Sequence, residues 1–337
     1  MRAVQVTAPG RIEVVEVPRP QPGPGEALLR IKYAGVCGSD LQTFTGNQPF
    51  ATYPRVPGHE FSAEVIEVNG EAEGLAPGML VTANPYFNCG HCYSCRRGLV
   101  NCCESNQTMG VHRDGAFQEY IAMPIGRIYP GKTLDAQQLA MIEPFSIGFH
   151  AANRARIGPD DNVLVLGAGA IGIFAMLSAM VKGAKVWIAD LLESRLAAAA
   201  ALGAQGTLNL KGITNVEQAA RELTSGNGFD VVMEATGVPE SFLNSIAASA
   251  FGGRISLIGN GKREVSFNQS VLIKKELDVV GSRNSLDAFL PLIDHVAAGT
   301  VDVRPLATTV YPFAQTVEAM QDLLDHPENN IKVLISF

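Results

Sequence analysis

The chain has 337 residues, of which 47% are hydrophobic and 18% charged, and this composition excludes a mainly disordered protein. A domain usually has about 100–200 residues, so the length predicts two domains. The formal net charge is −7 and no run of five like charges occurs, so the basic stripe typical of nucleic-acid-binding proteins is absent and no nucleic-acid partner is predicted.

The N-terminal segment lacks the features of a secretory signal, because Glu13 and Glu16 interrupt it and no apolar run follows. A longer uncharged stretch covers residues 162–181, about the length of a membrane span. It contains the β-branched run VLVLG and several glycines, which indicate a strand, a turn and a buried helix instead. We therefore predict no membrane segment and a cytoplasmic protein.

The first 130 residues consist of short apolar or alternating runs separated by glycine and proline. Such runs are typical of strands, and the connector PRPQPGPGE (18–26) belongs to no element interior. The pattern predicts a β-rich domain. Its expected strands are Arg2–Thr7, Ile12–Val17, Ala27–Ala34, Phe61–Val68 and Leu80–Ala83.

Strands and helices alternate beyond a helix-period segment at 136–155. Strands joined by helical crossovers form a doubly wound parallel sheet, so an α/β domain is predicted here. The expected strands are Asn162–Leu166, Lys185–Ala189, Thr207–Leu210, Asp230–Glu234, Arg254–Ile258 and Leu277–Val280. The expected helices are Ala170–Lys182, Ser194–Leu202, Val216–Thr224 and Glu240–Ala250.

The C-terminal part returns to a mixed pattern. Helices are expected at Ser285–Gly299 and Ala314–Asp325, followed by a final strand at Ile331–Phe337. If that strand rejoins the first domain, the first domain is discontinuous in sequence.

The hexapeptide GAGAIG (167–172) matches the dinucleotide-binding pattern G-x-G-x-x-G. It follows the strand VLVL and precedes a helix, which is the context that the pattern requires. Gly167 would allow the tight turn, Gly169 would let the backbone approach a pyrophosphate, and Gly172 would allow close helix packing. Ile171 lies within the motif, and the helix N-terminus would offer N–H groups to the phosphates.

The next strand, KVWIAD, ends at Asp190. A carboxylate there can accept hydrogen bonds from the adenosine ribose and would repel a ribose phosphate, so NAD is predicted over NADP. Asp190 could instead cap a helix or remain solvated. Arg195, five residues later, could shield the adenine or simply be exposed.

Four cysteines have the short spacings of a zinc-binding lobe: Cys89, Cys92, Cys95 and Cys103. Four thiolates can enclose one zinc ion and leave no position for a substrate, which is typical of a structural site. The surrounding lobe, residues 86–104, has few apolar residues, so the metal would stabilise its fold. Cys102 neighbours Cys103 and is the less favoured ligand.

A second metal site is predicted from residues far apart in the sequence. Cys37 lies in GVCGSD, His59 and Glu60 lie in PGHEF, and Glu143 lies in IEPF. Each alone could be a buried cysteine, a packed polar residue or a surface charge. Three such ligands together would leave a fourth zinc position open for water or an alcohol.

Together these motifs resemble those of the zinc-containing medium-chain alcohol and polyol dehydrogenases, over essentially the whole chain. The matching segments are GVCGSD, GHE, the four-cysteine lobe, GVHRDGAFQEY, EPF, GAGAIG and EATG. An acidic ligand at the catalytic metal is typical of the sorbitol and threonine dehydrogenase branch. The segments GNQPFATYPRVPGHEF and VVGSRNS look most similar to bacterial L-galactonate and L-gulonate dehydrogenases.

The resemblance implies a discontinuous GroES-like catalytic domain, residues 1–152 and 286–337, and a Rossmann NAD-binding domain, residues 153–285. It further implies two zinc ions per chain, one catalytic and one structural, with NAD as the second cofactor. The family also implies a homodimer or a homotetramer, and the apolar segment at 277–280 could be an edge strand covered by another subunit.

The resemblance also assigns roles at the catalytic zinc. Cys37 and His59 would be ligands, with either Glu60 or Glu143 as the acidic ligand. Asp40 would hold the ring of His59 by its far nitrogen, and Ser39 would relay the proton of the substrate. Many relatives continue this relay with a histidine where this chain has Gln42, which cannot take up a proton.

The function implied is hydride transfer from a secondary alcohol of a sugar acid, of the L-gulonate or L-galactonate type, to NAD. The alternatives are a polyol dehydrogenase, an L-threonine dehydrogenase and, more distantly, a non-catalytic NAD-binding regulator. A sugar-acid substrate would need a cation for its carboxylate, and Arg55, Arg113 and Arg283 are candidates.

Overall fold

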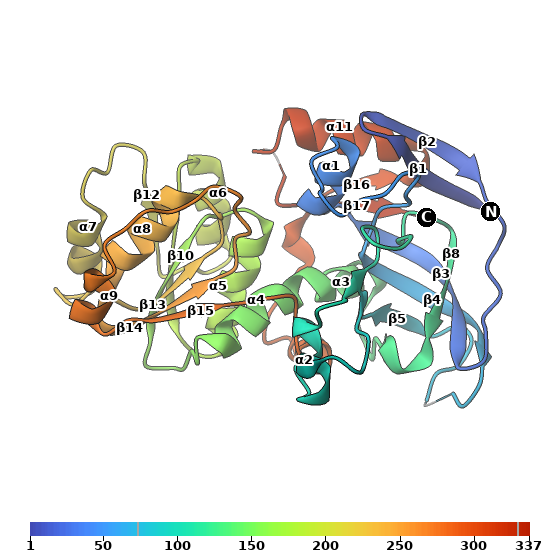
Figure 1. Ribbon diagram of the computed structural model, residues 1–337, viewed down its shortest axis with the longest axis horizontal. Helices are drawn as coiled ribbons and strands as arrows, with labels where there is room; N and C mark the ends of the chain where they lie inside the picture. Colours follow the sequence, from blue (N-terminus) through green and yellow to red (C-terminus); the bar gives the residue numbers. More distant parts are fainter. Residues whose placement is uncertain (73, 329) are drawn as a thin grey trace. The chain divides into compact units, whose positions relative to one another are not determined.

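The chain divides into two units, which a computed structural model describes for residues 1–72, 74–328 and 330–337. The first unit comprises Met1–Glu143 and Phe289–Phe337, and the second comprises Pro144–Ala288. The first unit therefore carries both the blue and the red ends of the chain in Figure 1. The first boundary lies inside helix α4 (Ile142–Arg154), whereas the sequence-based boundary of 152/153 lies near its end.

A seven-stranded sheet forms the centre of the first unit, together with two small two-stranded sheets. Its last strand, β17 (Lys332–Ser336), comes from the C-terminus and pairs with β3 (Glu26–Gly35). The predicted return of the C-terminal strand to the first domain is thus confirmed. The other strands are β1 (Arg2–Ala8), β2 (Arg11–Glu16), β4 (Glu60–Asn69), β5 (Leu80–Ala83), β6 (Tyr86–Phe87), β7 (Gln107–Thr108), β8 (Tyr120–Pro124), β9 (Ile128–Pro130) and β16 (Ala307–Pro312).

The alternation of side chains along β3 explains how this sheet forms. Leu29 and Ile31 are buried in the core of the unit, while Arg30 between them is exposed. The Arg30 guanidinium donates to the carboxylate of Glu64 on the neighbouring strand β4 at 2.6 Å. Successive side chains of a strand point to opposite faces, so one face of β3 packs on the core and the other is solvated.

The second unit is a six-stranded parallel sheet with the order β12-β11-β10-β13-β14-β15. The strand order reverses between β10 and β13, which is where ligands bind in doubly wound sheets. The predicted α/β fold with a doubly wound sheet is confirmed. The strands are β10 (Asn162–Leu166), β11 (Lys185–Asp190), β12 (Gly206–Asn209), β13 (Phe229–Glu234), β14 (Ser249–Leu257) and β15 (Asp278–Gly281).

Most helices lie within a few residues of the predicted ranges. The uncharged stretch at 162–181 forms β10 and α5, and no helix among the described residues is long and apolar enough to span a bilayer. The α-helices besides α4 are α1 (Gly38–Phe44), α2 (Tyr93–Arg96), α3 (Ala136–Ala140), α5 (Ala170–Val181), α6 (Glu193–Ala201), α7 (Val216–Leu223), α8 (Pro239–Ala248), α9 (Ser270–Lys275), α10 (Phe289–Ala297) and α11 (Thr316–Asp325).

Three helix predictions were wrong at an end or in the interior. The helix expected at 285–299 begins only at Phe289, as α10. The segment 136–155 is split into α3 and α4 at Met141. The helix expected at 240–250 ends at Ala248, because the buried ammonium of Lys275 donates to the carbonyl oxygens of Ile246, Ala247 and Ser249 at 2.8–3.0 Å. These contacts satisfy carbonyls that a helix end leaves free, and β14 begins directly at Ser249.

Candidate active site

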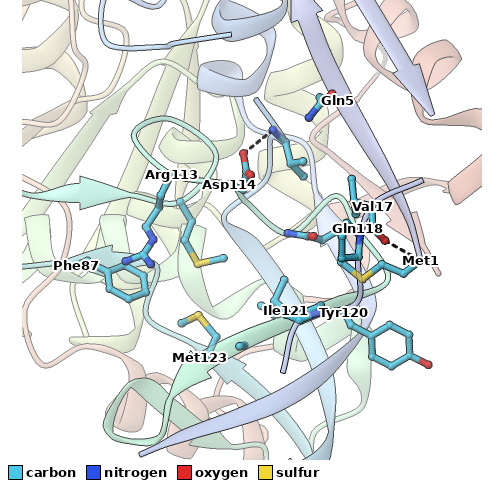
Figure 2. Close-up of a pocket in the computed structure, with 15 residues that line it drawn as sticks. Met1, Gln5, Val17, Phe87, Arg113, Asp114, Gln118, Tyr120, Ile121 and Met123 are labelled. Atoms are coloured by element: carbon cyan, nitrogen blue, oxygen red, sulfur yellow. Dashed lines mark hydrogen bonds between the residues drawn. The ribbon is translucent and has the colours of Figure 1, made fainter. Parts of the chain in front are cut away.

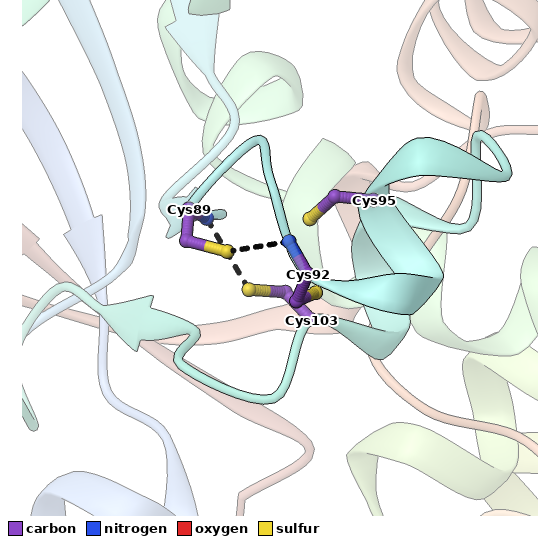
Figure 3. Close-up of side chains that lie close together, drawn as sticks. All are labelled: Cys89, Cys92, Cys95 and Cys103. Carbon is purple, nitrogen blue, oxygen red and sulfur yellow. Dashed lines mark hydrogen bonds between the residues drawn. The ribbon is translucent and has the colours of Figure 1, made fainter.

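Four cysteine thiols converge in the first unit, as Figure 3 shows. The sulfur atoms of Cys89, Cys92, Cys95 and Cys103 all lie within 4.8 Å of one another. The backbone N–H of Cys92 donates to the sulfur of Cys89 at 3.3 Å, and the N–H of Cys89 donates to that of Cys103 at 3.2 Å. The structure thus brings together the four predicted ligands and leaves Cys102 outside the group.

The environments of these thiols shift their pKa values in opposite directions. Backbone N–H groups at Cys95 and Glu104 lower the pKa of the Cys92 thiol to about 6, while burial raises the pKa of Cys103 to about 11. Helix α2, which carries Cys95, has no buried residue. A four-thiolate set is typical of a closed tetrahedral zinc site, so we expect a bound ion to stabilise this lobe.

A second group lies where the end of β3 is paired with the beginning of β4. One ligand atom each of Cys37, His59 and Glu60 lies within 4.8 Å of the others. Gly35 of β3 is paired with Glu60 of β4, and a Cβ atom added to Gly35 would lie 2.2 Å from a carboxylate oxygen of Glu60. Glycine is therefore required at 35 for the Glu60 side chain to reach the group.

Asp40 anchors both segments of this group. Its carboxylate is fully buried and accepts from the N–H of Cys37 and from the N–H of Gly58, each at 2.9 Å. The expected hydrogen bond to His59 is not formed, because the Asp40 oxygen lies 3.8 Å from Nδ1 of the ring. The two backbone hydrogen bonds tie together the loops that carry Cys37 and His59, and the imidazole stays within ion-pair distance of Asp40.

The negatively charged surroundings of His59 are suited to a bound cation. The ring is buried, and its Nδ1 has no hydrogen-bond partner among the described residues. Burial alone lowers the pKa of the imidazole, but the negative charges of Asp40, Cys37 and Glu143 raise it well above its usual value. A thiolate, an imidazole and a carboxylate are ligands that zinc prefers, so these residues fit a zinc ion with an open position.

Lys332 is a residue of this site that the sequence interpretation missed. Its ammonium group, 3% exposed, donates to both carboxylate oxygens of Glu60 at 2.8 and 2.7 Å and to the carbonyl of Val36 at 3.2 Å. The available signal was a lone cation inside the apolar final strand, IKVLISF. A buried lysine is rarely unpaired, so that position required an anionic partner.

Glu143 lies in the first turn of α4 and is 2% exposed. The hydroxyl of Tyr86 on β6 donates a short hydrogen bond to its carboxylate. Burial, with the nearby charge of Glu60, raises the pKa of Glu143 to about 7. Glu143 is not among the three residues whose ligand atoms lie within 4.8 Å, and Tyr86 was not identified from the sequence.

The candidate arginines of the first unit are engaged elsewhere. Arg55 donates to Asp114 at 3.1 Å and to Thr52 at 2.6 Å. The Arg113 guanidinium lies 3.8 Å from the ring centroid of Phe87 and lines a pocket of about 300 Å³, which Figure 2 shows. Adjacent strand residues point to opposite sides, so Phe87 faces away from the metal group that Tyr86 approaches, and no candidate zinc ligand lines this pocket.

The glycine motif of the second unit has the geometry of a dinucleotide-binding turn. Gly167 has φ +96°, a conformation that favours glycine. A Cβ at Gly172 would lie 1.7 Å from the carbonyl oxygen of Gly167, so helix α5 packs too closely for any side chain there. A Cβ at Gly169 would meet nothing within 4 Å. Gly169 thus faces open space at the N-terminus of α5, and Ile171 lies half-buried in its first turn.

Asp190 is tied to the same turn. Its carboxylate accepts from the N–H groups of Ala168, Leu191 and Leu192 at 2.7–3.0 Å. A guanidinium nitrogen of Arg195 lies 3.9 Å from it. The structure therefore brings the predicted acidic residue and Arg195 next to the glycine motif, at the end of β11.

Two family models match the chain. One, described as the alcohol dehydrogenase GroES-like domain, matches residues 23–133, and the other, described as zinc-binding dehydrogenase, matches residues 170–298. The L-galactonate-5-dehydrogenase of Escherichia coli K12 is 36% identical over 319 residues, which cover 94% of this chain and 94% of that protein. The chain belongs to the zinc-dependent medium-chain alcohol dehydrogenase family.

Other relatives agree with this assignment. The sorbitol dehydrogenase of Bacillus subtilis is 29% identical, covering 99% of this chain and 97% of that protein. An Escherichia coli CFT073 crystal structure, described as a short chain alcohol dehydrogenase complexed with the cofactor NADH, has a TM-score of 0.92 and 29% identity, covering 100% and 99% of the two chains. The protein is an NAD-dependent, zinc-containing dehydrogenase acting on CH–OH donors.

Replacing Cys103 with serine should lower the zinc content from about two ions to about one per chain, because a four-ligand site loses a thiolate. The melting temperature should fall as well. Inductively coupled plasma mass spectrometry and thermal unfolding measure both effects. Cys102→Ser is the matched control and should retain both ions; equal zinc loss in the two variants would contradict the ligand set.

Replacing Lys332 with methionine should destabilise the zinc-free protein by about 3–5 kcal/mol, because it leaves the Glu60 carboxylate buried without its cation. The double variant K332M/E60Q should recover most of this loss, since neither charge remains. Urea unfolding of the wild type, both single variants and the double variant measures the coupling. Additive effects would show that the pair is not coupled.

Proposed function

We propose that this dehydrogenase oxidises a secondary alcohol of a sugar acid, of the L-gulonate or L-galactonate type, to the keto acid. The substrate class is supported by the identity to L-galactonate-5-dehydrogenase. The reaction rests on one observation, the convergence of the half-buried Cys37 with the buried side chains of His59 and Glu60. Three protein ligands leave one position of a four-coordinate zinc for the substrate.

We assign Cys37, His59 and Glu60 to the catalytic zinc, with Glu143 as the alternative acidic ligand. A zinc ion held there would supply Lewis-acid stabilisation of the alcohol oxygen. Lys332 balances the charge of Glu60, and Tyr86 fixes Glu143. The two carboxylates are thereby held by different partners, which supports distinct roles for them.

The oxidation moves a hydride from the alcohol carbon to the nicotinamide and releases the hydroxyl proton. We assign the first proton transfer to Ser39, which is half-buried in the first turn of α1, two residues beyond Cys37. Asp40 positions this turn through the N–H of Cys37. Gln42 on the same helix cannot take up a proton, so the proton passes from Ser39 to water or to a cofactor hydroxyl.

We place the dinucleotide at residues 167–172. The open space at Gly169 at the start of α5 supports a pyrophosphate there, since a helix N-terminus offers N–H donors to anions. The Asp190 carboxylate would accept from the adenosine ribose and repel a ribose phosphate, which favours NAD over NADP. Arg195, beside Asp190, is assigned to the adenine side.

A polyol is the second candidate substrate. Arg55 donates to Asp114, and the guanidinium face of Arg113 packs on the ring of Phe87. A neutral polyol needs no cation to bind, whereas a sugar-acid carboxylate is best held by a bidentate arginine. The sequence identity to sorbitol dehydrogenase also supports a polyol substrate.

The zinc-replete enzyme should reduce NAD with L-gulonate or L-galactonate faster than with D-sorbitol, L-threonine or ethanol, because the proposed substrate is a sugar acid. NADH absorbance on this panel, with NAD and with NADP, measures the preference. Faster turnover of sorbitol or threonine would contradict the sugar-acid assignment and leave the zinc-dependent reaction intact.

The control variant is His59→Ala, which should lose turnover and keep NADH binding, because it removes a proposed zinc ligand of the first unit only. A variant that retains turnover would contradict the catalytic site. Absence of turnover in the zinc-replete wild type on the whole panel, with NADH binding retained, would reopen the hypothesis of a non-catalytic regulator.

A cytoplasmic location is part of the proposal. All six cysteines are free thiols, and four of them converge without forming disulfides. Thiolate metal sites of this kind persist in a reducing compartment.

We also propose that two copies associate through β15, the last strand of the six-stranded sheet. An edge strand offers unpaired backbone groups, and a second copy related by a two-fold axis would add its own β15 to them. An exposed apolar side chain close in sequence supports this surface: Ile273 of α9, the helix before β15, is 76% exposed.

Ile273→Glu should reduce the mass of the oligomer, because it places a charge on the proposed apolar interface. Light scattering after size-exclusion chromatography measures the mass; a wild-type dimer should become monomeric, and a tetramer should lose half its mass or more. Val14→Glu, at another exposed apolar position, is the matched control. An unchanged mass in the Ile273 variant would place the interface elsewhere.

A further inference from the structure

Glu234 is a buried carboxylate with no role in the chemistry described above. It ends β13, the strand beside β10, and its side chain is 2% exposed. Its carboxylate accepts from the N–H and the hydroxyl of Thr236 at 2.8 and 2.5 Å and from the N–H of Gly237 at 3.1 Å. The charge is thus satisfied entirely by donors of the turn that follows its own strand.

That turn is packed against the dinucleotide motif. A Cβ added to Gly167 would lie 2.7 Å from the methyl group of Thr236, so the two turns are in close contact. The N–H of Ala235 donates to the carbonyl of Leu166, the residue before Gly167, at 3.0 Å. The position of Thr236 therefore limits where the turn at Gly167 can lie.

The other side of the turn is equally confined. A Cβ at Gly259 would lie 2.0 Å from the nitrogen of Gly237, and a Cβ at Gly261 would lie 1.7 Å from its carbonyl oxygen. The carbonyl of Glu234 accepts from the N–H groups of Ile258 and Gly259 at 2.8 and 3.0 Å. The turn is held between the glycine motif and the end of β14, at the carboxyl edge where dinucleotides bind.

The backbone itself gives this turn few internal contacts. Helix α8 begins at Pro239, and its N-cap, Val238, has no side chain that can accept a hydrogen bond. Helix N-termini leave N–H groups without intrahelical partners. Glu234 supplies acceptors for the N–H groups of Thr236 and Gly237, while the Thr236 hydroxyl accepts from the N–H of Val238 at 3.1 Å.

We propose that Glu234 is a positioning residue for NAD: by fixing the turn at Thr236 and Gly237, it sets the position of the phosphate-binding turn at Gly167. This inference rests on the proposed placement of the dinucleotide at residues 167–172. Glu234 acts through Thr236 and does not touch the cofactor, so its loss weakens NAD binding and leaves the zinc sites intact.

The test compares E234Q with D230N, which makes the same change of carboxylate to amide at the amino end of the same strand. Asp230 accepts from the backbone and side-chain N–H groups of Asn162 at 2.8 and 3.1 Å, away from the glycine motif. In E234Q the amide NH2 replaces one of the two oxygens that accept from the N–H of Gly237, and the remaining oxygen is a neutral acceptor, which forms weaker hydrogen bonds. We expect NADH to bind E234Q about 10–100-fold more weakly, since small displacements of a binding turn have effects of this size.

NADH dissociation constants are measured by calorimetry on the zinc-replete protein, at a temperature well below its melting temperature. The melting temperature of each variant is measured separately. In steady state, KM for NAD should rise while KM for the alcohol stays unchanged. D230N should keep NADH affinity within about twofold even where its melting temperature falls. Unchanged affinity in E234Q, or equal losses in E234Q and D230N, would overturn the inference.

T236V provides an independent variant if E234Q fails to fold. It keeps the methyl contact at Gly167 and removes the hydroxyl that donates to Glu234 and accepts from Val238. We expect weaker NADH binding, and wild-type affinity would overturn the proposed route through this turn.

G169A separates failure of this inference from failure of the dinucleotide placement. An alanine side chain there meets no protein atom within 4 Å, so the variant should fold normally and bind NADH more weakly. Wild-type affinity in G169A would overturn the placement and, with it, the role of Glu234. Weaker binding in G169A with unchanged binding in E234Q would overturn the role of Glu234 alone.

Discussion

Burial of negative charge is the constraint on which the first unit depends. Asp40, Glu60 and Glu143 are all almost inaccessible to solvent, close to the thiol of Cys37 and the ring of His59. A buried carboxylate without a partner is costly, so each of the three requires its own compensation. The elements that surround the site are arranged to supply it.

The compensation differs in kind from one carboxylate to the next. Asp40 receives two backbone N–H groups, Glu60 receives the ammonium of Lys332, and Glu143 receives the hydroxyl of Tyr86. These partners leave the Cys37 thiol and the His59 ring facing the same anionic surroundings. A divalent cation at that point completes the charge balance, so stability of the unit and affinity for zinc have a common electrostatic origin.

Carboxylates that accept from backbone N–H groups recur in both units. Asp40 joins the loops that carry the proposed zinc ligands, Asp190 joins the end of β11 to the glycine motif, and Glu234 closes the turn beside it. An ionised acceptor forms hydrogen bonds about twice as strong as a neutral one. Loops held in this way keep a fixed geometry without an apolar core of their own, which is what a binding turn at a sheet edge requires.

The sequence by itself determined what depends on neighbours along the chain. The spacing of Cys89, Cys92, Cys95 and Cys103 and the strand–turn–helix at 167–172 were readable because short loops and helix geometry impose them locally. Hydrophobic periodicity likewise located the six strands of the parallel sheet. Local sequence patterns did not predict the end of α8 at Ala248, because carbonyl groups near that end bind Lys275, which is distant in sequence.

Only the tertiary structure decided how charge is paired. Lys332 is 272 residues from Glu60 in sequence, and Tyr86 is 57 residues from Glu143. The family resemblance assigned Asp40 to the ring of His59; in the folded chain its carboxylate accepts from two backbone N–H groups and lies 3.8 Å from the ring. Periodicity and spacing in the sequence indicate which residues are buried. The partner of a buried charge depends instead on which strands and helices pack together, and this packing is a property of the whole fold.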